Sequence, residues 1–287
     1  MSELRPIDTG TDHLQARVED GVAILVMNRP ERRNALSDEM LRGMAAALRE
    51  AETASDVRCV VLTGAGGAFC AGGDVKGFAA DTSRGASSST SSGGAPSSGP
   101  SYEQRVAGLR RGMEMVKWLH EMPKPTLAVI PGAAAGAGLS LALACDLRIA
   151  AESAVITTAF AKVGFSGDYG GTYFLTHLVG AAKARELYYL SDRIDAKEAE
   201  RLGLVNRVVP DASLESETRA LAARIATGAA VAFRYMKENL NRAQECASAE
   251  ECLDLEATHH VHTGLTEDHR DAAKAFVEKR TPVFKGR

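Results

Sequence analysis

Small residues in the segment 132–138 form a pattern that could bind developing negative charge. An apolar run over 124–130 leads into this loop, which contains only glycine and alanine, and a helix of small residues follows it. A ligand can approach such a backbone closely, and the start of the helix directs free N–H groups toward it. Those groups would stabilise an oxyanion. Close packing between a strand and a helix would favour the same residues, so the loop alone leaves both interpretations open.

A second loop of small residues, 66–76, favours the oxyanion interpretation. Two backbone donors that meet at one oxygen need two separate tight loops, although two ordinary turns remain the alternative. A dinucleotide-binding loop is disfavoured. Gly136 and Gly138 begin that fingerprint, but Leu141 stands where its third glycine belongs.

Asp168 adds a carboxylate in a third glycine-rich segment, 164–171. Apolar neighbours such as Phe160, Val163 and Phe165 would raise its pKa toward that of a usable base. An aspartate that caps a turn within Gly-Asp-Tyr-Gly is the alternative interpretation.

The elements that must position these loops alternate between strand and helix. The segments 14–18 and 22–27 read as a hairpin, Ser37 caps a helix, and 59–63 reads as a buried strand. This order predicts a layered α/β core over residues 1–210. Further strands are expected over 147–151, 155–158 and 208–209, and further helices over 173–180, 182–190 and 196–205.

One long helix is expected over 102–121, after a serine- and glycine-rich surface insertion at 79–101. Its inward residues would be Val106, Leu109, Met113, Val116 and Trp118. Residues 211–287 read as a helical region for oligomerisation. Its expected segments are 220–232, 236–247, 249–265 and 267–278, with His259, His260 and His262 at the surface or at an interface.

Composition excludes several classes of protein. The chain has 287 residues and a net charge of −3, which argues against bulk nucleic-acid binding. It shows no apolar run of membrane-spanning length and no signal-peptide core, so no membrane partner is expected. The five cysteines lack metal-binding spacing and read as reduced thiols in a cytoplasmic protein with no metal site.

Several motifs together resemble the crotonase, or enoyl-CoA hydratase/isomerase, superfamily. They are the segments 28–36, 66–76, 124–146, 199–205 and 276–280. The resemblance covers nearly the whole chain except the serine-rich insertion. It implies a spiral of ββα units with a C-terminal helical region, assembled as a homo-trimer or a dimer of trimers. It also implies an acyl-CoA substrate, with coenzyme A as part of that substrate and no separate cofactor.

The resemblance assigns roles by position. The backbone N–H groups of Gly73 and Ala137 would form the oxyanion hole for the thioester carbonyl. Residues that match the adenine and pantetheine path are Ala35, Ala71, Asp74 and Val75. Phe276 and Lys279 match a C-terminal contact to the nucleotide end, often made by a neighbouring subunit, although an amphipathic helix end would read the same.

The chain departs from the hydratase pattern at both catalytic glutamates. Ser140 stands at the first position and Phe160 at about the second. Ser140 could position water or a substrate group, or could be a small helix residue without a role. Asp168 matches an aspartate of the isomerase branches, in the loop that faces the acyl chain.

One base suffices to move a double bond, because it can lift a proton and return it two carbons away. The sequence therefore favours enoyl-CoA isomerisation, with Asp168 as acid and base and Gly73 and Ala137 as oxyanion donors. An enoyl-CoA hydratase with a non-standard acid–base set is the first alternative. A non-catalytic acyl-CoA-binding protein is the second.

Overall fold

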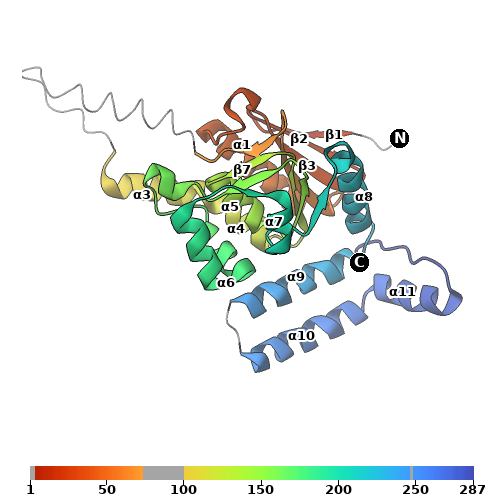
Figure 1. Ribbon diagram of the computed structural model, residues 1–287. Helices are drawn as coiled ribbons and strands as arrows, with labels where there is room; N and C mark the ends of the chain where they lie inside the picture. The colour runs from red at the N-terminus through yellow and green to blue at the C-terminus, as the bar shows by residue number, and fades with distance from the viewer. Residues whose placement is uncertain (1–3, 74–99, 246–247) are drawn as a thin grey trace, which may run out of the picture.

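The computed structural model describes residues 4–73, 100–245 and 248–287, and its core contains two sheets (Figure 1). The seven-stranded sheet has the order β1-β2-β3-β4-β6-β8-β11, and the four-stranded sheet has the order β10-β9-β7-β5. The strands of the larger sheet are β1 (Arg5–Ile7), β2 (Leu14–Glu19), β3 (Val22–Met27), β4 (Cys59–Gly64), β6 (Thr126–Ile130), β8 (Leu147–Ala151) and β11 (Arg207–Val209). The smaller sheet contains β5 (Ala68–Cys70), β7 (Ala133–Ala135), β9 (Val155–Thr157) and β10 (Ile194–Asp195).

The chain winds between the two sheets in a repeating pattern. β4, β6 and β8 of the larger sheet are followed directly by β5, β7 and β9 of the smaller one, and the strands pair in parallel from one turn to the next. Helix α4 (Glu114–Glu121) precedes β6, and α5 (Ala137–Ala144) follows β7. The predicted spiral of ββα units is confirmed.

Alternation along the strands builds two separate cores. Val60 and Leu62 of β4 face a large cluster that includes α1 (Asp38–Thr53), α4 and α5. Cys59 and Val61 face the opposite side, where α8 (Leu214–Ala226) covers the sheet. Successive side chains of a strand point to opposite faces, so a strand buried on both faces is apolar throughout.

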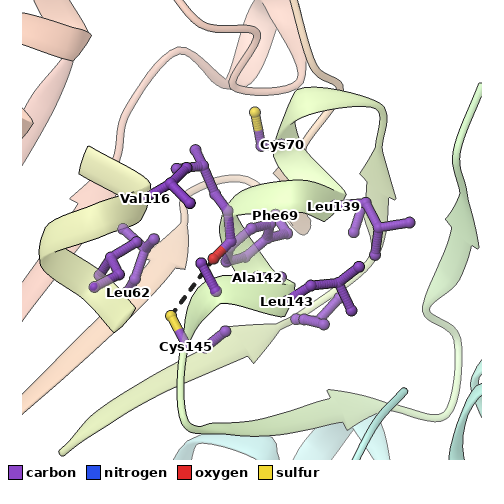
Figure 2. Packing of buried hydrophobic residues seen from close by; sticks show 14 of the residues in the cluster. Leu62, Phe69, Cys70, Val116, Leu139, Ala142, Leu143 and Cys145 are labelled. Atoms are coloured by element: carbon purple, nitrogen blue, oxygen red, sulfur yellow. Dashed lines mark hydrogen bonds between the residues drawn. The ribbon is translucent and has the colours of Figure 1, made fainter. Parts of the chain in front are cut away.

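Helix α5 is buried along its whole length, which its small residues allow. Figure 2 shows its side chains packed with Leu62 of β4, Phe69 and Cys70 of β5, and Val116 of α4. The helix ends where Cys145 Sγ donates a long hydrogen bond of 3.6 Å to the Leu141 carbonyl. Because α5 is buried from Ala137 onward, its start also lies inside the core.

The C-terminal helices extend away from the sheets. α9 (Ala230–Gln244) packs on α4, α10 (Ala249–Gly264) packs on α9, and α11 (Glu267–Glu278) packs on α10 (Figure 1). Lys237 of α9 is buried and lies 2.9 Å from the Asp146 carboxylate of the core. It also donates to the carbonyls of Leu119 and Lys124, at 3.0 and 3.2 Å. This cation joins the helical region to the core.

The prediction of one helix over 102–121 is wrong. The segment forms α3 (Tyr102–Gly112) and α4, with the break at Met113. Glycine is a weak helix former, and at Gly112 a side chain would meet the Tyr169 hydroxyl at 3.2 Å. Val106 and Leu109 are each 49% exposed and do not point inward. Against the described residues, no residue of α3 is buried.

The later helices correct three further expectations. The helix α6 (Gly171–Leu190) joins the two predicted segments across a kink at Gly180, which has non-helical backbone angles. The predicted alanine-rich segment 220–232 is divided between α8 and α9. His259 is buried, not at the surface: its Nδ1 lies 2.6 Å from Asn239 Oδ1, and its ring packs on Tyr235.

The remaining elements of the described residues are helix α7 (Ala196–Arg201) and the short 3-10 helices η1 (Pro30–Arg32), η2 (Phe160–Val163) and η3 (Asp211–Ser213). Among residues 4–73, 100–245 and 248–287, no helix has both the length and the apolar character required to cross a membrane.

Candidate active site

Asn34 fixes the loop that precedes α1, a role that the sequence analysis did not assign to it. The residue is fully buried and has a positive φ of 57°, which asparagine tolerates better than most residues. Its Oδ1 accepts a hydrogen bond from the Arg29 N–H, and its Nδ2 donates to the carbonyls of Ala65 and Ala68, all at 2.8 Å. The side chain thus joins the 28–36 loop to the beginning of the small-residue loop 66–76.

The two small-residue loops lie against each other, as the sequence predicts. A Cβ added at Gly72 would lie 2.9 Å from the Ala135 carbonyl oxygen and 3.4 Å from the Ala137 nitrogen. A Cβ at Gly138 would lie 2.4 Å from the Cys70 carbonyl oxygen. Glycine at both positions permits a contact between backbones that any side chain would prevent.

The N–H groups in this contact are available as donors. Ala137 is the first residue of α5, so its N–H has no acceptor inside the helix. No backbone acceptor for the Gly73 N–H is found among the described residues. Ala137 is 2% exposed, so a charge that binds at this helix start is largely shielded from water.

Asp168 has an unsatisfied carboxylate in the loop between η2 and α6. Its Oδ1 is buried and has no hydrogen-bond partner among the described residues. Burial raises the pKa of Asp168 from 3.8 to about 6, because the charged form loses contact with water. A buried polar atom without a partner is uncommon in native proteins and is a mark of functional sites.

Two hydroxyl groups approach the same loop. A Cβ added at Gly171 would lie 2.4 Å from Ser140 Oγ and 2.6 Å from the Tyr188 hydroxyl. A Cβ at Gly167 would lie 3.3 Å from the same Tyr188 oxygen. Ser140 is buried and donates a hydrogen bond of 3.2 Å to the Gly136 carbonyl oxygen. Tyr188 was not predicted, since nothing in the α6 sequence distinguishes its hydroxyl from that of a packing tyrosine.

Phe160 supports this arrangement from η2. Its ring is buried and stacks on the Tyr188 ring with centroids 5.7 Å apart and planes 12° apart. Phe160, which the resemblance places at about the second glutamate position of hydratases, thus contributes an apolar side chain beside the loop. The other expected apolar neighbours of Asp168 are largely in solvent, because Val163 is 47% and Phe165 is 57% exposed. The predicted rise of the Asp168 pKa is confirmed, although these two side chains are largely exposed.

The remaining predicted residues lie in three places. Ala35 is buried, and its carbonyl accepts a hydrogen bond from Arg29 Nη1 at 2.7 Å. The Ala71 N–H donates to the Arg33 carbonyl at 2.9 Å, so both alanines belong to the paired loops. Asp74 and Val75 lie outside the described residues.

Phe276 and Lys279 lie at the end of α11, on the opposite side of the molecule from α6 (Figure 1). Phe276 is 87% exposed, and Lys279 has a positive φ of 55° where the helix ends. One chain therefore does not bring this pair next to Asp168. A role at the active site would require a neighbouring subunit.

A cavity of about 350 Å³ lies between α9 and the core, away from the small-residue loops. His120, Phe174 and Lys237 are among its lining residues. Phe174 also approaches Gly170 of the Asp168 loop, where an added Cβ would lie 3.0 Å from its ring. Neither the small-residue loops nor Asp168 is among its lining residues.

Comparisons with known proteins agree with this geometry. A family model described as enoyl-CoA hydratase/isomerase matches residues 17–95 and 102–287. The chain is 36% identical to the 1,2-epoxyphenylacetyl-CoA isomerase of Escherichia coli, over 96% of this chain and 99% of the relative. It is 34% identical to the short-chain-enoyl-CoA hydratase of Clostridium acetobutylicum, over 91% and 93%. The crystal structure of an enoyl-CoA hydratase from Bacillus anthracis superposes with a TM-score of 0.85 at 32% identity, covering 96% of this chain and all of that one. The chain therefore belongs to the enoyl-CoA hydratase/isomerase family, the crotonase superfamily.

Proposed function

We propose that this enzyme isomerises an enoyl-CoA, with Asp168 as the acid and base. One observation carries the proposal: Asp168 has a buried carboxylate oxygen without a hydrogen-bond partner among the described residues, and its pKa is raised to about 6. By the resemblance to the family, Ser140 and about Phe160 stand where hydratases carry their two glutamates. A carboxylate with a pKa near neutrality can both accept and return a proton.

The proposed reaction needs only groups of this chain. The thioester carbonyl oxygen accepts hydrogen bonds from the N–H groups of Gly73 and Ala137. Asp168 removes a proton from carbon 2 or carbon 4 of the acyl chain, and the electron pair moves through the conjugated system onto the thioester oxygen. The same carboxyl group returns the proton at the other carbon, which shifts the double bond and regenerates Asp168. No cofactor is required beyond the coenzyme A that the substrate carries.

The two relatives named above represent both candidate reaction types. One is named an isomerase of an acyl-CoA, and the other is named an enoyl-CoA hydratase. Hydration by this chain would use Asp168 with Ser140 or a bound water in place of the missing glutamates. A protein that binds acyl-CoA without turnover is the second alternative.

The deciding experiment incubates the enzyme in heavy water with 2-enoyl-, 3-enoyl- and aromatic acyl-CoAs and follows their masses. Isomerisation predicts deuterium uptake without an added water, and Asp168→Asn should slow it about 10²–10⁴-fold. Asp168→Asn keeps the size of the side chain but removes the base. Addition of one water would support the hydratase. Binding without any change of mass would support a non-catalytic acyl-CoA-binding protein.

We also propose that the C-terminal helices join three chains, singly or as a dimer of trimers. Large apolar side chains of these helices are exposed in the single chain, among them Leu253, Val261, Leu265, Phe276 and Val277. Exposed apolar area of this extent is typical of surfaces that become buried in an assembly. Sedimentation equilibrium should give three or six times the mass of one chain, and a monomer would contradict the proposal.

A further inference from the structure

We propose that the hydroxyls of Tyr188 and Ser140 hold one hydroxyl-type oxygen beside Asp168, supplied by a hydroxyacyl group or by water. This inference rests on the proposed function of the Asp168 site, and it makes Tyr188 a further substrate-contacting residue. It also gives Ser140 a defined role as a hydrogen-bond acceptor.

The positions of the two oxygens carry the argument. A Cβ at Gly171 would lie 2.4 Å from Ser140 Oγ and 2.6 Å from Tyr188 Oη, so the two oxygens lie no more than 5.0 Å apart, the sum of these distances. They form no direct hydrogen bond with each other in the described part of the chain. A single oxygen atom at about 2.8 Å from each partner can bridge a separation of up to roughly 5.5 Å. The two hydroxyls can therefore bind the same atom.

Two glycines keep this space open next to Asp168. Besides the contact at Gly171, a side chain at Gly167 would lie 2.9 Å from the Tyr188 ring, and Gly167 has a φ of 112° that favours glycine. The Gly171 N–H donates to the Asp168 carbonyl at 3.1 Å, which closes the turn between these glycines. The Tyr188 hydroxyl thus meets both ends of the segment that contains Asp168.

The hydrogen-bond roles define the ligand. The Ser140 hydroxyl donates to the Gly136 carbonyl, so its oxygen is left to accept. The phenol of Tyr188 stays protonated, because burial and then the Asp168 charge raise its pKa above the ordinary value. It is left to donate. An oxygen that accepts from Tyr188 and donates to Ser140 is a hydroxyl or a water, whereas a ketone or ether oxygen can satisfy only one partner.

The stacked Phe160 ring makes the geometry stable. The planes of the Phe160 and Tyr188 rings lie 12° apart, and this stacking orients the phenol oxygen. Tyr188→Phe would keep this stacking and remove only the hydroxyl. The neighbouring Tyr189 is 74% exposed and provides a matched control for the same chemical change.

The test compares wild type, Tyr188→Phe and Tyr189→Phe in two measurements. Calorimetry gives the affinities of butyryl-CoA, 3-hydroxybutyryl-CoA and 4-hydroxybutyryl-CoA. Mass spectrometry follows addition of ¹⁸O water to crotonyl-CoA. If the oxygen belongs to the substrate, wild type and Tyr189→Phe should bind one hydroxyacyl-CoA about tenfold more tightly than butyryl-CoA, and Tyr188→Phe should lose that preference.

If the oxygen belongs to water, no hydroxyacyl preference is expected, and Tyr188→Phe alone should slow the addition of ¹⁸O water at least tenfold. Ser140→Ala should reproduce the Tyr188→Phe result and serves if that variant fails to fold. The inference is overturned if Tyr188→Phe matches Tyr189→Phe in both measurements. Failure of the proposed function is seen separately, as an Asp168→Asn variant that exchanges deuterium at the wild-type rate.

Discussion

At the scale of single residues, the site keeps a carboxylate where the fold cannot satisfy it. Asp168 Oδ1 is buried and has no hydrogen-bond partner in the described part of the chain, although backbone N–H groups of a glycine-rich turn lie nearby in the chain. A capping aspartate would be hydrogen-bonded to such groups, and its pKa would be lowered instead of raised. The alternative interpretation of Asp168 as a turn cap is therefore disfavoured by its side-chain contacts.

The pH dependence of turnover should follow Asp168. The base is active only when ionised, and its pKa is raised to about 6. We expect kcat/KM for isomerisation to be constant above about pH 7 and to fall tenfold per pH unit well below pH 6. A pH–rate profile between pH 5 and 8.5 measures this, and a flat profile over that range would exclude Asp168 as the base.

Asp168→Asn should make the protein more stable while it removes activity. The native carboxyl binds its proton more tightly than the unfolded chain does, since the pKa rises from 3.8 to about 6. Native stability is therefore lost as the pH rises from about 4 through about 6. At pH 7.5 we expect a gain of about 1 kcal/mol in the free energy of unfolding, reduced by the partial exposure of the group.

Denaturant unfolding at pH 7.5 and at pH 4.5 checks the stability prediction. At pH 4.5 most of this loss has not yet occurred, so the two proteins should differ less than at pH 7.5. An Asp168→Asn variant that is less stable than wild type at pH 7.5 would show that the charged carboxylate is satisfied in solution.

At the scale of elements, the proposed oxyanion site lies where β5 contacts the start of α5. Gly136 precedes the helix with φ 53° and ψ −127°, a conformation that only glycine adopts readily. Gly138 then faces Cys70 at a distance that admits no side chain. The strand, the turn and the helix start therefore act as one unit, and glycines set the separation of its donors.

Gly138→Ala should separate these donors. The added Cβ would lie 2.4 Å from the Cys70 carbonyl oxygen and 2.8 Å from its sulfur, so backbone must shift. We expect a loss of about 1–3 kcal/mol in unfolding free energy and a large fall in kcat. Gly264→Ala, at the end of α10, is the control, because nothing lies within 4 Å of its added Cβ. Equal thermal stability and activity of the two variants would contradict this account of the loop contact.

At the scale of the whole molecule, a buried lysine connects α9 to the α/β core. Lys237 of α9 is 7% exposed and binds Asp146 together with two backbone carbonyls of the core. A buried lysine is tolerated only when such partners replace its water. The exposed apolar side chains of α10 and α11 are thus presented on a support that is firmly attached.

Lys237→Met should release α9 from the core. Removing one partner of a buried ion pair typically costs about 3–5 kcal/mol. Asp146 keeps its hydrogen bonds from Thr126 and is 25% exposed, so we expect a loss at or below the lower end of that range. We expect faster hydrogen exchange over 230–278 and weaker assembly, with the sheets still protected. Lys274→Met is the control, because Lys274 is 69% exposed and, within the described residues, pairs with Glu278 on its own helix. Unchanged exchange over α9 in the Lys237 variant would refute this role.

The sequence by itself determined the features that depend on periodicity and on local backbone chemistry. Alternation in β4 follows from burial on two faces, and Ser37 caps α1 through its bond to the Met40 N–H, as predicted. The close approach of the two small-residue loops was also predictable, since a backbone contact leaves a trace in composition: only small residues such as glycine and alanine permit it. These signals are local, and each can be found within a few consecutive residues.

Only the tertiary structure decided which distant side chains meet. Tyr188 reaches Ser140 through the packing of α6 on α5, and Lys237 reaches Asp146 through the docking of α9. The exposure of Val106 and Leu109 and the burial of His259 likewise depend on what covers each helix. Such contacts join elements far apart in the chain, and neither residue type nor spacing records which face of a helix finds a partner.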